Sequence, residues 1–333
     1  MGYFAAHFAT IGCNSPLFTG SPMKVHHLQE TALRYFVEVV RCGSITEASI
    51  RLGVAGSAIS RQIAHLENVL ETTLFDRRPR GMVPSAAGKV LAAHAFKAAL
   101  DADHVIQQIA DLQGAKGGKI RLASSEGFAI EFLPEAVAEF QKHYPGISFD
   151  VAVSEPVDVP RRIIEGEADI GFVFSRTPQK EIKVEHRQPA PVLAVMRPDH
   201  PLAHRDYLDL AEIIQFPLAL PDQSTTVRQL FDIACSLQQL LIEPAITSNF
   251  IVCLHNFVRA GNGITVSGEV SVRNACRRGN LVAKLIRDKG LDARNLELQT
   301  LVGRTLPKPV QLFLDFLREK LELERFPVSE MLA

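Results

Sequence analysis

The chain has 333 residues, 47% of them hydrophobic, and a formal net charge of −1 at pH 7. This length and apolar content predict two or three domains with their own cores, and the balanced charge argues against a protein that binds nucleic acid over its whole surface. Charge is uneven, because residues 24–90 hold nine Lys and Arg against six Asp and Glu, and the rest of the chain holds 27 against 31. This distribution indicates that nucleic acid would bind near the N-terminus only.

The N-terminal residues and the cysteines indicate the cellular compartment in which the protein works. Residues 1–23 contain no Lys or Arg, which argues against a secretory signal peptide. We expect either a flexible extension there or a true start at Met23. Five widely spaced cysteines, at positions 13, 42, 235, 253 and 276, predict a reducing compartment instead of a disulfide framework. No run approaches 18 apolar residues without a charge. We therefore expect a cytoplasmic protein without a membrane-spanning helix.

Residues 44–67 have the pattern of two short helices joined by a tight turn. Ser44 and Glu47 form the S-x-x-E pattern of a capping box, in which each side chain bonds the other residue's backbone N–H. Gly53 can adopt the positive φ that turns the chain. We expect a helix of about two turns before it and a second helix from residue 56 to residue 67.

The second of these helices has one apolar and one polar face. Its apolar residues fall at i, i+4 and i+7 and predict a buried stripe of Ile59, Ile63 and Leu66. The outward face carries short hydrogen-bonding side chains and one long cation, from Ser57, Ser60 and Arg61. Such side chains suit base edges and phosphates in a DNA major groove. Helix–turn–helix shapes also occur in proteins that never bind DNA, so the neighbouring segments matter.

Those neighbouring segments favour DNA binding. An upstream helix that would support the pair has an apolar stripe of Leu33, Phe36, Val37 and Val40. Downstream, a turn at Pro79 and Gly81 is surrounded by three basic residues, Arg77, Arg78 and Arg80. This arrangement predicts a basic wing that lies along a phosphate backbone.

Residues 86–113 predict one long helix with Ser85 as its N-cap. Apolar residues recur along it at alternating steps of four and three, the heptad spacing of a coiled-coil seam. The seam predicts that two chains pair through Leu91, Ala95, Ala98, Ala102, Val105, Ile109 and Leu112. The alternative is an ordinary amphipathic helix that lies on its own domain.

After Gly114, Gly117 and Gly118 the pattern changes to alternating strands and helices, which is typical of parallel sheets with helical crossovers. The predicted strands are 119–123, 147–153, 169–174, 192–197, 217–220, 245–247, 264–266 and 296–302. The predicted helices are 133–143, 158–166, 208–214, 226–237, 250–260 and 309–324. We infer two α/β lobes, with the chain crossing between them near residue 193 and again near residue 297.

Residues 33–88 resemble the winged helix–turn–helix of the LysR-type transcriptional regulators. The resemblance rests on the A-I-S-R-Q-I, L-E and L-F-D-R runs and the closing P-S-x-A-G, and it continues to about residue 326. It implies an α/β fold with an all-α-dominated N-terminal winged helix–turn–helix, a long linker helix and a two-lobed effector domain built like a periplasmic binding protein. Such a pair of lobes holds a small molecule in the cleft between them.

The resemblance also implies domain boundaries. The extension at 1–23 precedes a DNA-binding domain at 24–85, a linker and dimerisation helix at 86–113, and an effector-binding domain at 118–326. Lobe I comprises 118–192 and 298–326, and lobe II comprises 193–297. Pairing through the linker helix implies a roughly dyad-symmetric DNA site.

The resemblance assigns DNA contact to positions in the helical pair and the wing. These positions are Ser44, Ala55, Gly56, Ser57, Ser60, Arg61, Arg77, Arg78 and Arg80. The family usually has Ser and then Gln, which commonly contacts bases, where this chain has Ala55 and Gly56. The resemblance therefore does not supply that base contact or the sequence of the DNA site.

Hydroxyl side chains gather where an effector would bind. Ligands of open α/β sheets lie outside the carboxyl ends of the strands, and hydroxyls near helix N-termini suit an anion such as a carboxylate. The candidate effector residues, including three Phe for an apolar wall, are Ser124, Ser125, Phe128, Ser154, Phe174, Ser224, Thr225, Thr226, Ser248, Asn249 and Phe250. Arg228 is a candidate counter-ion. The alternative for each hydroxyl is simple helix capping.

Other classes of function have weaker support. The chain contains no Walker-type loop, G-x-S-x-G elbow or H-E-x-x-H motif, so we expect no catalytic residues, no cofactor and no metal. One alternative is a thiol-based redox regulator of the same architecture, although no run of cations near Cys235 or Cys253 would lower a thiol pKa. Another is a small-molecule-binding protein that has lost DNA reading. The expected partners are double-stranded DNA, a small-molecule effector, further copies of this chain as a dimer or tetramer, and RNA polymerase, but no membrane.

Overall fold

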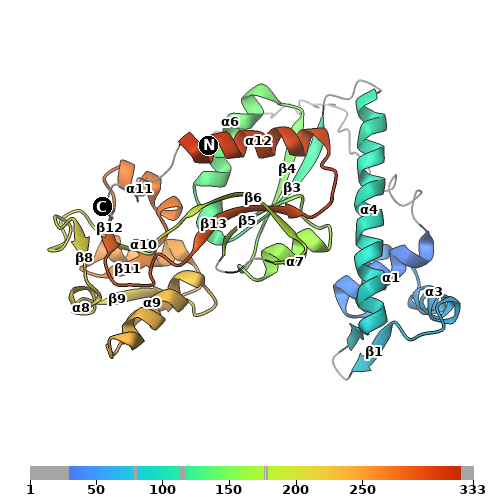
Figure 1. Cartoon of the computed structure of the whole chain (residues 1–333), viewed down its shortest axis with the longest axis horizontal. Coiled ribbons are helices and arrows are strands. Elements are labelled where there is room, and N and C mark those ends of the chain that lie inside the picture. The colour runs from blue at the N-terminus through green and yellow to red at the C-terminus, as the bar shows by residue number, and fades with distance from the viewer. Residues whose placement is uncertain (1–29, 79–80, 113–116, 176, 178, 324–333) are drawn as a thin grey trace, which may run out of the picture.

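The computed structural model describes residues 30–78, 81–112, 117–175, 177 and 179–323. The expected extension at 1–23, Arg80 and Gly114 lie outside these residues, and the side chains of Arg77 and residues 110–112 are likewise not described. Figure 1 shows an N-terminal domain at one end, a long helix beside it, and two α/β lobes in a row on the other side of that helix. Among the described residues, no helix is long and apolar enough to cross a membrane.

The N-terminal domain consists of three helices and a two-stranded hairpin. The helices are α1 (Thr31–Cys42), α2 (Ile45–Leu52) and α3 (Gly56–Val69), and the antiparallel strands are β1 (Phe75–Arg78) and β2 (Gly81–Pro84). The expected turn is present, with Gly53 at φ 66°. Only half of the expected capping box forms: Ser44 Oγ accepts from the Glu47 N–H at 3.4 Å, whereas the Glu47 carboxylate bonds Arg51.

One small core fixes the arrangement of these helices. The predicted stripe on α3 is buried, together with Phe36 and Ala48 from the other two helices. The hairpin is held against the end of α1, because the Met82 N–H donates to Gly43 O at 2.8 Å. Gly81, at φ 128°, permits this approach, since a Cβ there would lie 2.5 Å from the same carbonyl oxygen. The hairpin is therefore fixed relative to α3.

Helix α4 (Ala86–Leu112) packs on two different parts of its own chain. Ser85 caps it as expected, accepting from the Gly88 N–H at 3.0 Å. Ala95 is 2% exposed in the core of the N-terminal domain, so this residue, predicted for the dimer seam, packs inside its own chain. Further along, Val105 and Ile109 are 43% and 48% exposed. The heptad pattern therefore divides into an intrachain part and an exposed part.

Lobe I is a five-stranded sheet of order β4-β3-β5-β13-β6. The strands are β3 (Gly118–Ser124), β4 (Ile147–Val153), β5 (Ile170–Ser175), β6 (Ile182–Pro189) and β13 (Asn295–Leu301), and the helices are α5 (Glu126–Ala129), α6 (Phe132–His143), α7 (Asp158–Ile164) and α12 (Lys308–Leu323). Strands β3, β4 and β5 are parallel, but β13 runs antiparallel to both neighbours. The expectation of a parallel sheet was therefore incomplete, and β6 was not predicted.

Lobe II is a six-stranded mixed sheet of order β10-β9-β11-β7-β12-β8. The strands are β7 (Leu193–Met196), β8 (Tyr207–Leu208), β9 (Leu218–Pro221), β10 (Pro244–Ser248), β11 (Ile264–Ser267) and β12 (Val282–Ile286). The helices are α8 (Leu210–Ile213), α9 (Thr226–Leu237), α10 (Ile251–Ala260), the short η2 (Glu269–Ser271) and α11 (Arg273–Arg277). Strand β12 and helix α11 were not predicted.

The chain passes between the lobes through two segments that bond each other. The Ala190 N–H, just after β6, donates to Arg294 O at 3.1 Å, and Arg294 Nε donates to Ala190 O at 2.7 Å. Lobe I also contacts helix α4, where Leu100 is 2% exposed and Gly166 approaches it. Near this contact Asp103 of α4 lies 3.8 Å from Arg121.

Candidate DNA interface and effector site

The outward face of α3 is exposed, as expected from the sequence. Ser57, Ser60 and Arg61 all lie on the surface opposite the buried stripe. Ser60 Oγ donates to Gly56 O at 3.0 Å, which orients this hydroxyl along its own helix. Arg61 has no ion-pair partner among the residues described, so its charge is available to a phosphate or a base.

The first turn of α3 has room for a larger side chain. Ala55 is the exposed N-cap residue and makes no side-chain capping bond. A Cβ on Gly56 would lie 3.4 Å from Ile45 Cγ2 and 4.0 Å from Ser49 Cβ, which is ordinary van der Waals contact. Gly56 is therefore not required by close packing, in contrast to Gly53, whose positive φ favours glycine. Ser44, also predicted to contact DNA, uses its hydroxyl to cap α2.

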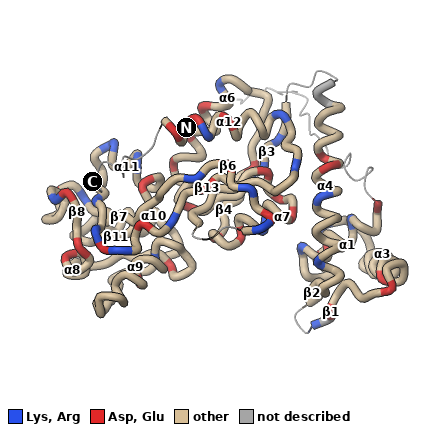
Figure 2. Tube along the Cα trace, in the orientation of Figure 1, with Lys and Arg blue, Asp and Glu red and all other residues tan. Residues whose placement is uncertain are grey.

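The β1–β2 hairpin carries the predicted basic wing. Arg77 and Arg78 lie on β1, and the side chain of Arg78 is exposed. Figure 2 shows blue, basic positions on β1, and Figure 1 places the hairpin and α3 at the end of the molecule away from lobe II. The hairpin can therefore contact DNA beside α3 without obstruction from lobe II.

Five of the hydroxyls predicted for the effector site fall into two groups. In the first group the hydroxyl is already used: Ser124 Oγ donates to Ser125 O at 2.8 Å, Thr225 Oγ1 accepts from the Arg228 N–H at 3.3 Å, and Ser248 Oγ accepts from the Phe250 N–H at 3.0 Å. In the second group, Ser125 and Ser154 have buried Oγ atoms without a hydrogen-bond partner among the described residues. The second group is the better candidate for ligand contact.

The remaining predicted effector residues do not form one surface. Phe128 and Phe174 are buried and stacked, with ring centroids 4.6 Å apart, whereas Phe250 is 57% exposed. Ser224 and Asn249 are exposed and Thr226 is half-buried at the start of α9. The three Phe residues therefore do not form the apolar wall expected from the sequence, because Phe128 is fully buried in the core of lobe I.

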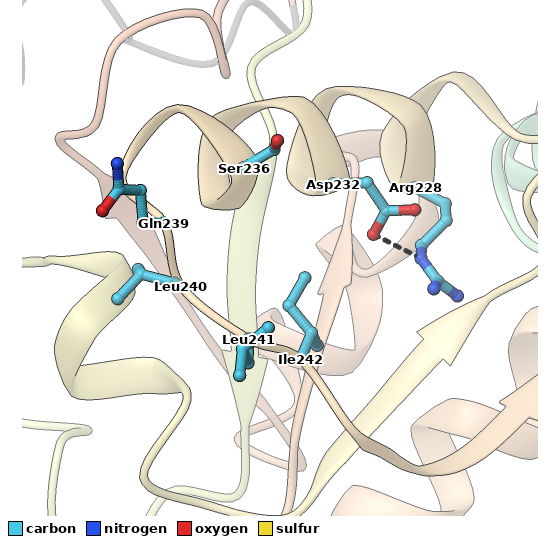
Figure 3. Close-up of a pocket in the computed structure, with 7 residues that line it drawn as sticks. All are labelled: Arg228, Asp232, Ser236, Gln239, Leu240, Leu241 and Ile242. Atoms are coloured by element: carbon cyan, nitrogen blue, oxygen red, sulfur yellow. Dashed lines mark hydrogen bonds and ion pairs between the residues drawn. The ribbon is translucent and has the colours of Figure 1, made fainter.

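A surface pocket of about 440 Å³ lies along α9, as Figure 3 shows. It is lined by Arg228, Asp232, Ser236, Gln239, Leu240, Leu241 and Ile242. Arg228 was the expected counter-ion, but its Nε lies 2.7 Å from Asp232 Oδ1 and its Nη1 donates to Pro221 O at 3.1 Å. Because Asp232 already pairs with this guanidinium, Arg228 is a weaker candidate counter-ion than the sequence indicated.

The two lobes are joined by hydrogen bonds from backbone N–H groups of lobe II to carboxylates of lobe I. Glu126 Oε1 of lobe I accepts from the Ile251 N–H, at the start of α10 in lobe II, at 2.9 Å. Burial raises the pKa of this carboxyl, and the bond from Ile251 partly offsets the effect. Glu131 Oε2 accepts from the Asn274 N–H of α11 at 3.0 Å. These bonds hold the carboxyl ends of strands from both lobes opposite one another.

Arg294 is a residue at the junction that the sequence did not single out. It is 1% exposed, and its guanidinium carbon lies 4.4 Å from the centroid of the Phe174 ring. Nη2 has no hydrogen-bond partner among the described residues. Burial lowers the pKa of Arg294 to about 9. Its burial depends on residues more than a hundred positions earlier, so no local pattern could have revealed it.

The cysteine environments disfavour thiol chemistry. Cys42, Cys235, Cys253 and Cys276 are free thiols, and Cys13 lies outside the described residues. Burial is the main cause that raises the pKa of Cys42 to about 11, that of Cys235 to about 12 and that of Cys276 to about 11. Raised values leave little reactive thiolate at neutral pH. Among the described residues, no cluster of three or more His, Cys, Asp or Glu could hold a metal ion.

Two protein-family models match the chain. The model for the bacterial regulatory helix-turn-helix protein of the lysR family matches residues 31–89, and the LysR substrate binding domain matches residues 113–322. The chain belongs to the LysR family of transcriptional regulators. The fold and the family expected from the sequence are thus confirmed.

Individual LysR-type proteins resemble the chain over much of its length. The transcriptional regulator YeiE of Escherichia coli (strain K12) is 26% identical over 255 residues, which is 77% of this chain and 85% of YeiE. The structure of full-length OxyR from Pseudomonas aeruginosa, with a Cys-to-Asp substitution, has a TM-score of 0.66 at 16% identity and covers 88% of this chain and 95% of OxyR. The regulatory domain of CcmR from Synechocystis PCC6803, in complex with 2-PG, has a TM-score of 0.51 at 20% identity and covers 61% of this chain and 97% of that domain.

Proposed function

We propose that this LysR-type regulator reads a specific DNA sequence with α3 and is controlled by a small anionic effector at the junction of its lobes. The observation that carries the proposal is the outward face of α3, where Ser57 and Arg61 are exposed opposite a buried apolar stripe. This face offers hydroxyls and one unpaired cation to a major groove, and the exposed Arg78 on the hairpin offers a phosphate contact.

The proposal for the effector rests on the buried hydroxyls that have no partner. Ser125 follows β3, and its Oγ is free to donate to a ligand. The CcmR domain, whose fold this chain shares, is in complex with 2-PG, which supports a small-molecule site in this kind of domain. We place the protein in the cytoplasm, where both DNA and metabolites are accessible.

The proposed assembly is a homo-oligomer that pairs through α4. Val105 and Ile109 are exposed on the part of α4 that leaves the N-terminal domain, and a second copy would cover them. Two copies would present two α3 helices to a roughly dyad-symmetric site. RNA polymerase is the further partner through which a DNA-bound oligomer would change transcription.

Control by an effector requires that it bind two arrangements of the protein with different affinity. Lobe I contacts both α1 and α4, so a change at the lobe junction has a direct route to the N-terminal domain. The proposed mechanism is that the effector changes the arrangement of the lobes and hence the spacing of the two α3 helices.

The test of DNA reading is Arg61→Ala, measured by fluorescence anisotropy on a DNA site selected with the parent protein. Loss of one base or phosphate contact should weaken specific binding by about 5- to 150-fold, because such a contact is worth about 1–3 kcal/mol. The matched control is Lys142→Ala, which removes an exposed cation from α6 in lobe I. If Arg61→Ala and the parent bind the selected DNA site with equal affinity, Arg61 on the outward face of α3 does not contact the DNA as proposed.

A further inference from the structure

The lobe junction contains a buried cation without an anionic partner. Arg294 is 1% exposed, it forms no ion pair with a described carboxylate, and burial alone accounts for the change in its pKa. With a pKa of about 9 the group still carries its charge at neutral pH. The hydrogen bond to Ala190 O and the contact with the Phe174 ring offset only part of the cost of burying this charge. Nη2 has no hydrogen-bond acceptor among the described residues. A buried unpaired charge is unfavourable unless a partner is supplied.

Two buried hydroxyls without partners belong to segments that approach the same aromatic ring. Ser125 and Ser267 are 4% and 2% exposed, and neither Oγ has a hydrogen-bond partner among the described residues. Nearby glycines show how close the backbone of each segment comes to the ring: a Cβ on Gly127 would lie 3.1 Å from Phe174 Cε2, and a Cβ on Gly268 would lie 3.5 Å from Phe174 Cζ. Segments from lobe I and lobe II therefore meet at the ring that the guanidinium covers.

These groups lie where an α/β protein gathers ligands. Ser125 comes directly after β3, Phe174 lies near the end of β5, and Ser267 is the last residue of β11. The carboxyl ends of strands from both lobes thus converge on one place, as expected for a ligand site in open sheets. The unpartnered polar atoms on these segments are two hydroxyls and a guanidinium nitrogen, all of which can donate to an oxyanion.

From this convergence we infer that Arg294 is the group that pairs with the effector's anion, that the effector carries a carboxylate, and that Ser125 and Ser267 donate to its oxygen atoms. The inference rests on the proposed function and names the chemistry of its ligand. Arg228 is less suited to this part, because Asp232 already pairs with its guanidinium at 2.7 Å. Because Arg294 also bonds Ala190, the pairing would act on the two segments through which the chain passes between the lobes.

The probe is sodium acetate, the smallest carboxylate of this type, with acetamide as the neutral analogue of the same shape. The thermal midpoint of the full chain is measured from 0 to 100 mM of each, at ionic strength held constant with sodium chloride. Acetate should raise the midpoint of the parent by about 2–4 °C and the effect should saturate. Acetamide should leave the midpoint unchanged.

Three variants assign the effect to a residue. Arg294→Met, similar in length and neutral, should abolish the response to acetate. Gly268→Ala keeps the charge but places a methyl group 2.6 Å from the Nη2 position, so it should also abolish the response and serves if Arg294→Met does not fold. Arg228→Met removes another buried guanidinium, outside the proposed contact, and should respond like the parent.

The inference is overturned if the parent does not respond to acetate, or if Arg294→Met and Gly268→Ala respond as the parent does. Its failure is distinguishable from failure of the proposed function. If the protein selects a DNA site and metabolites change this selection, but acetate has no effect, the proposed function stands. Only the assignment of Arg294 as the anion-binding residue is then wrong. If the acetate response depends on Arg294 but the protein selects no DNA sequence, the anion site is supported and the proposed function as a regulator fails.

Discussion

Arg41 Nη2, near the end of α1, donates to the backbone oxygen of Glu165 in lobe I at 2.7 Å. The same guanidinium lies 5.4 Å from the centroid of the Phe96 ring on α4 and 3.8 Å from Glu38. The acceptor belongs to the turn after α7, which continues through Gly166 at φ 70° beside Leu100 of α4. One hydrogen bond thus connects the helix that supports α3 directly to the effector domain.

Replacing Arg41 by Ala should loosen this turn. A charged hydrogen bond contributes about 1.5–3 kcal/mol, and the amides of Glu165 and Gly166 are bonded within the turn, so their exchange reports its opening. Hydrogen exchange at these two amides should accelerate by about tenfold or more. Glu38→Gln is the control, because it removes the ion pair and leaves the bond to the carbonyl oxygen. Unchanged exchange in Arg41→Ala would mean that the contact does not hold the lobe.

Gly56→Gln should alter the DNA sequence that the protein prefers without loss of stability. The position has ordinary van der Waals space, and Gln is a better helix former than Gly by about 0.5–1 kcal/mol. Gln pairs well with adenine in the major groove, so the variant's selected sites should gain an adenine preference in each half-site. Gly53→Ala is the contrasting variant and should lose about 1 kcal/mol of stability, because its φ is 66°. Identical selected sites for Gly56→Gln and the parent would place the first turn of α3 away from the bases.

Arg78→Ala should weaken binding to all DNA sequences by a similar factor. A phosphate contact releases counterions, so its loss should reduce the slope of log affinity against log salt by about one. The measurement is titration of selected and unrelated duplexes at several salt concentrations, with Lys142→Ala as the control. A changed sequence preference at constant slope would assign the hairpin to base reading instead.

His255 should make the effector domain less stable in mild acid. Burial, and secondarily Arg259, lowers the pKa of this imidazole from 6.5 to about 4, and the residue is 8% exposed. The unfolded chain takes up the proton first as pH falls, so the contribution is complete above pH 6.5 and is lost progressively towards pH 4. By pH 5 the loss should be about 2 kcal/mol in the free energy of unfolding.

The check is urea unfolding of the parent and of His255→Gln at pH 7.5 and pH 5. The neutral Gln takes up no proton, so the variant should lose less stability between the two pH values than the parent. The difference between the two proteins isolates His255 from the other titrating groups. Parallel losses would show that His255 is protonated without disturbing the fold.

The structure of the N-terminal domain could be predicted from local sequence patterns, whereas much of the effector domain depends on contacts between residues distant in the sequence. Gly53 and the stripe from Ile59 to Leu66 each specify their structure within a few residues, so the prediction and the structure agree there. Strand β6 was not predicted because its sequence is rich in charges. A strand distant in the sequence supplies a partner for one of these charges: Arg187 Nη2 lies 2.7 Å from Glu297 Oε1 on β13.

The candidate sites likewise contain residues that local patterns predict and residues that only distant contacts bring into place. The exposed position of Arg61 was predicted correctly, because helical periodicity alone places it opposite the buried stripe. Arg294 was not found, because its environment consists of Ala190 and Phe174, which only the folded lobes bring to it. Ala95 fits a heptad seam by spacing, but the N-terminal domain of the same chain covers it, and spacing cannot tell an intrachain partner from a second copy.

The most direct measurement is selection of fragmented genomic DNA by the purified full chain, with and without a metabolite extract of the same cells. We expect enrichment of a roughly dyad-symmetric site, and a change in the bound pattern when the extract is present. No enrichment in either condition would contradict this expectation, since Ala55 and Gly56 would then have left α3 without the ability to read DNA. Enrichment that the extract does not change would contradict control by an effector.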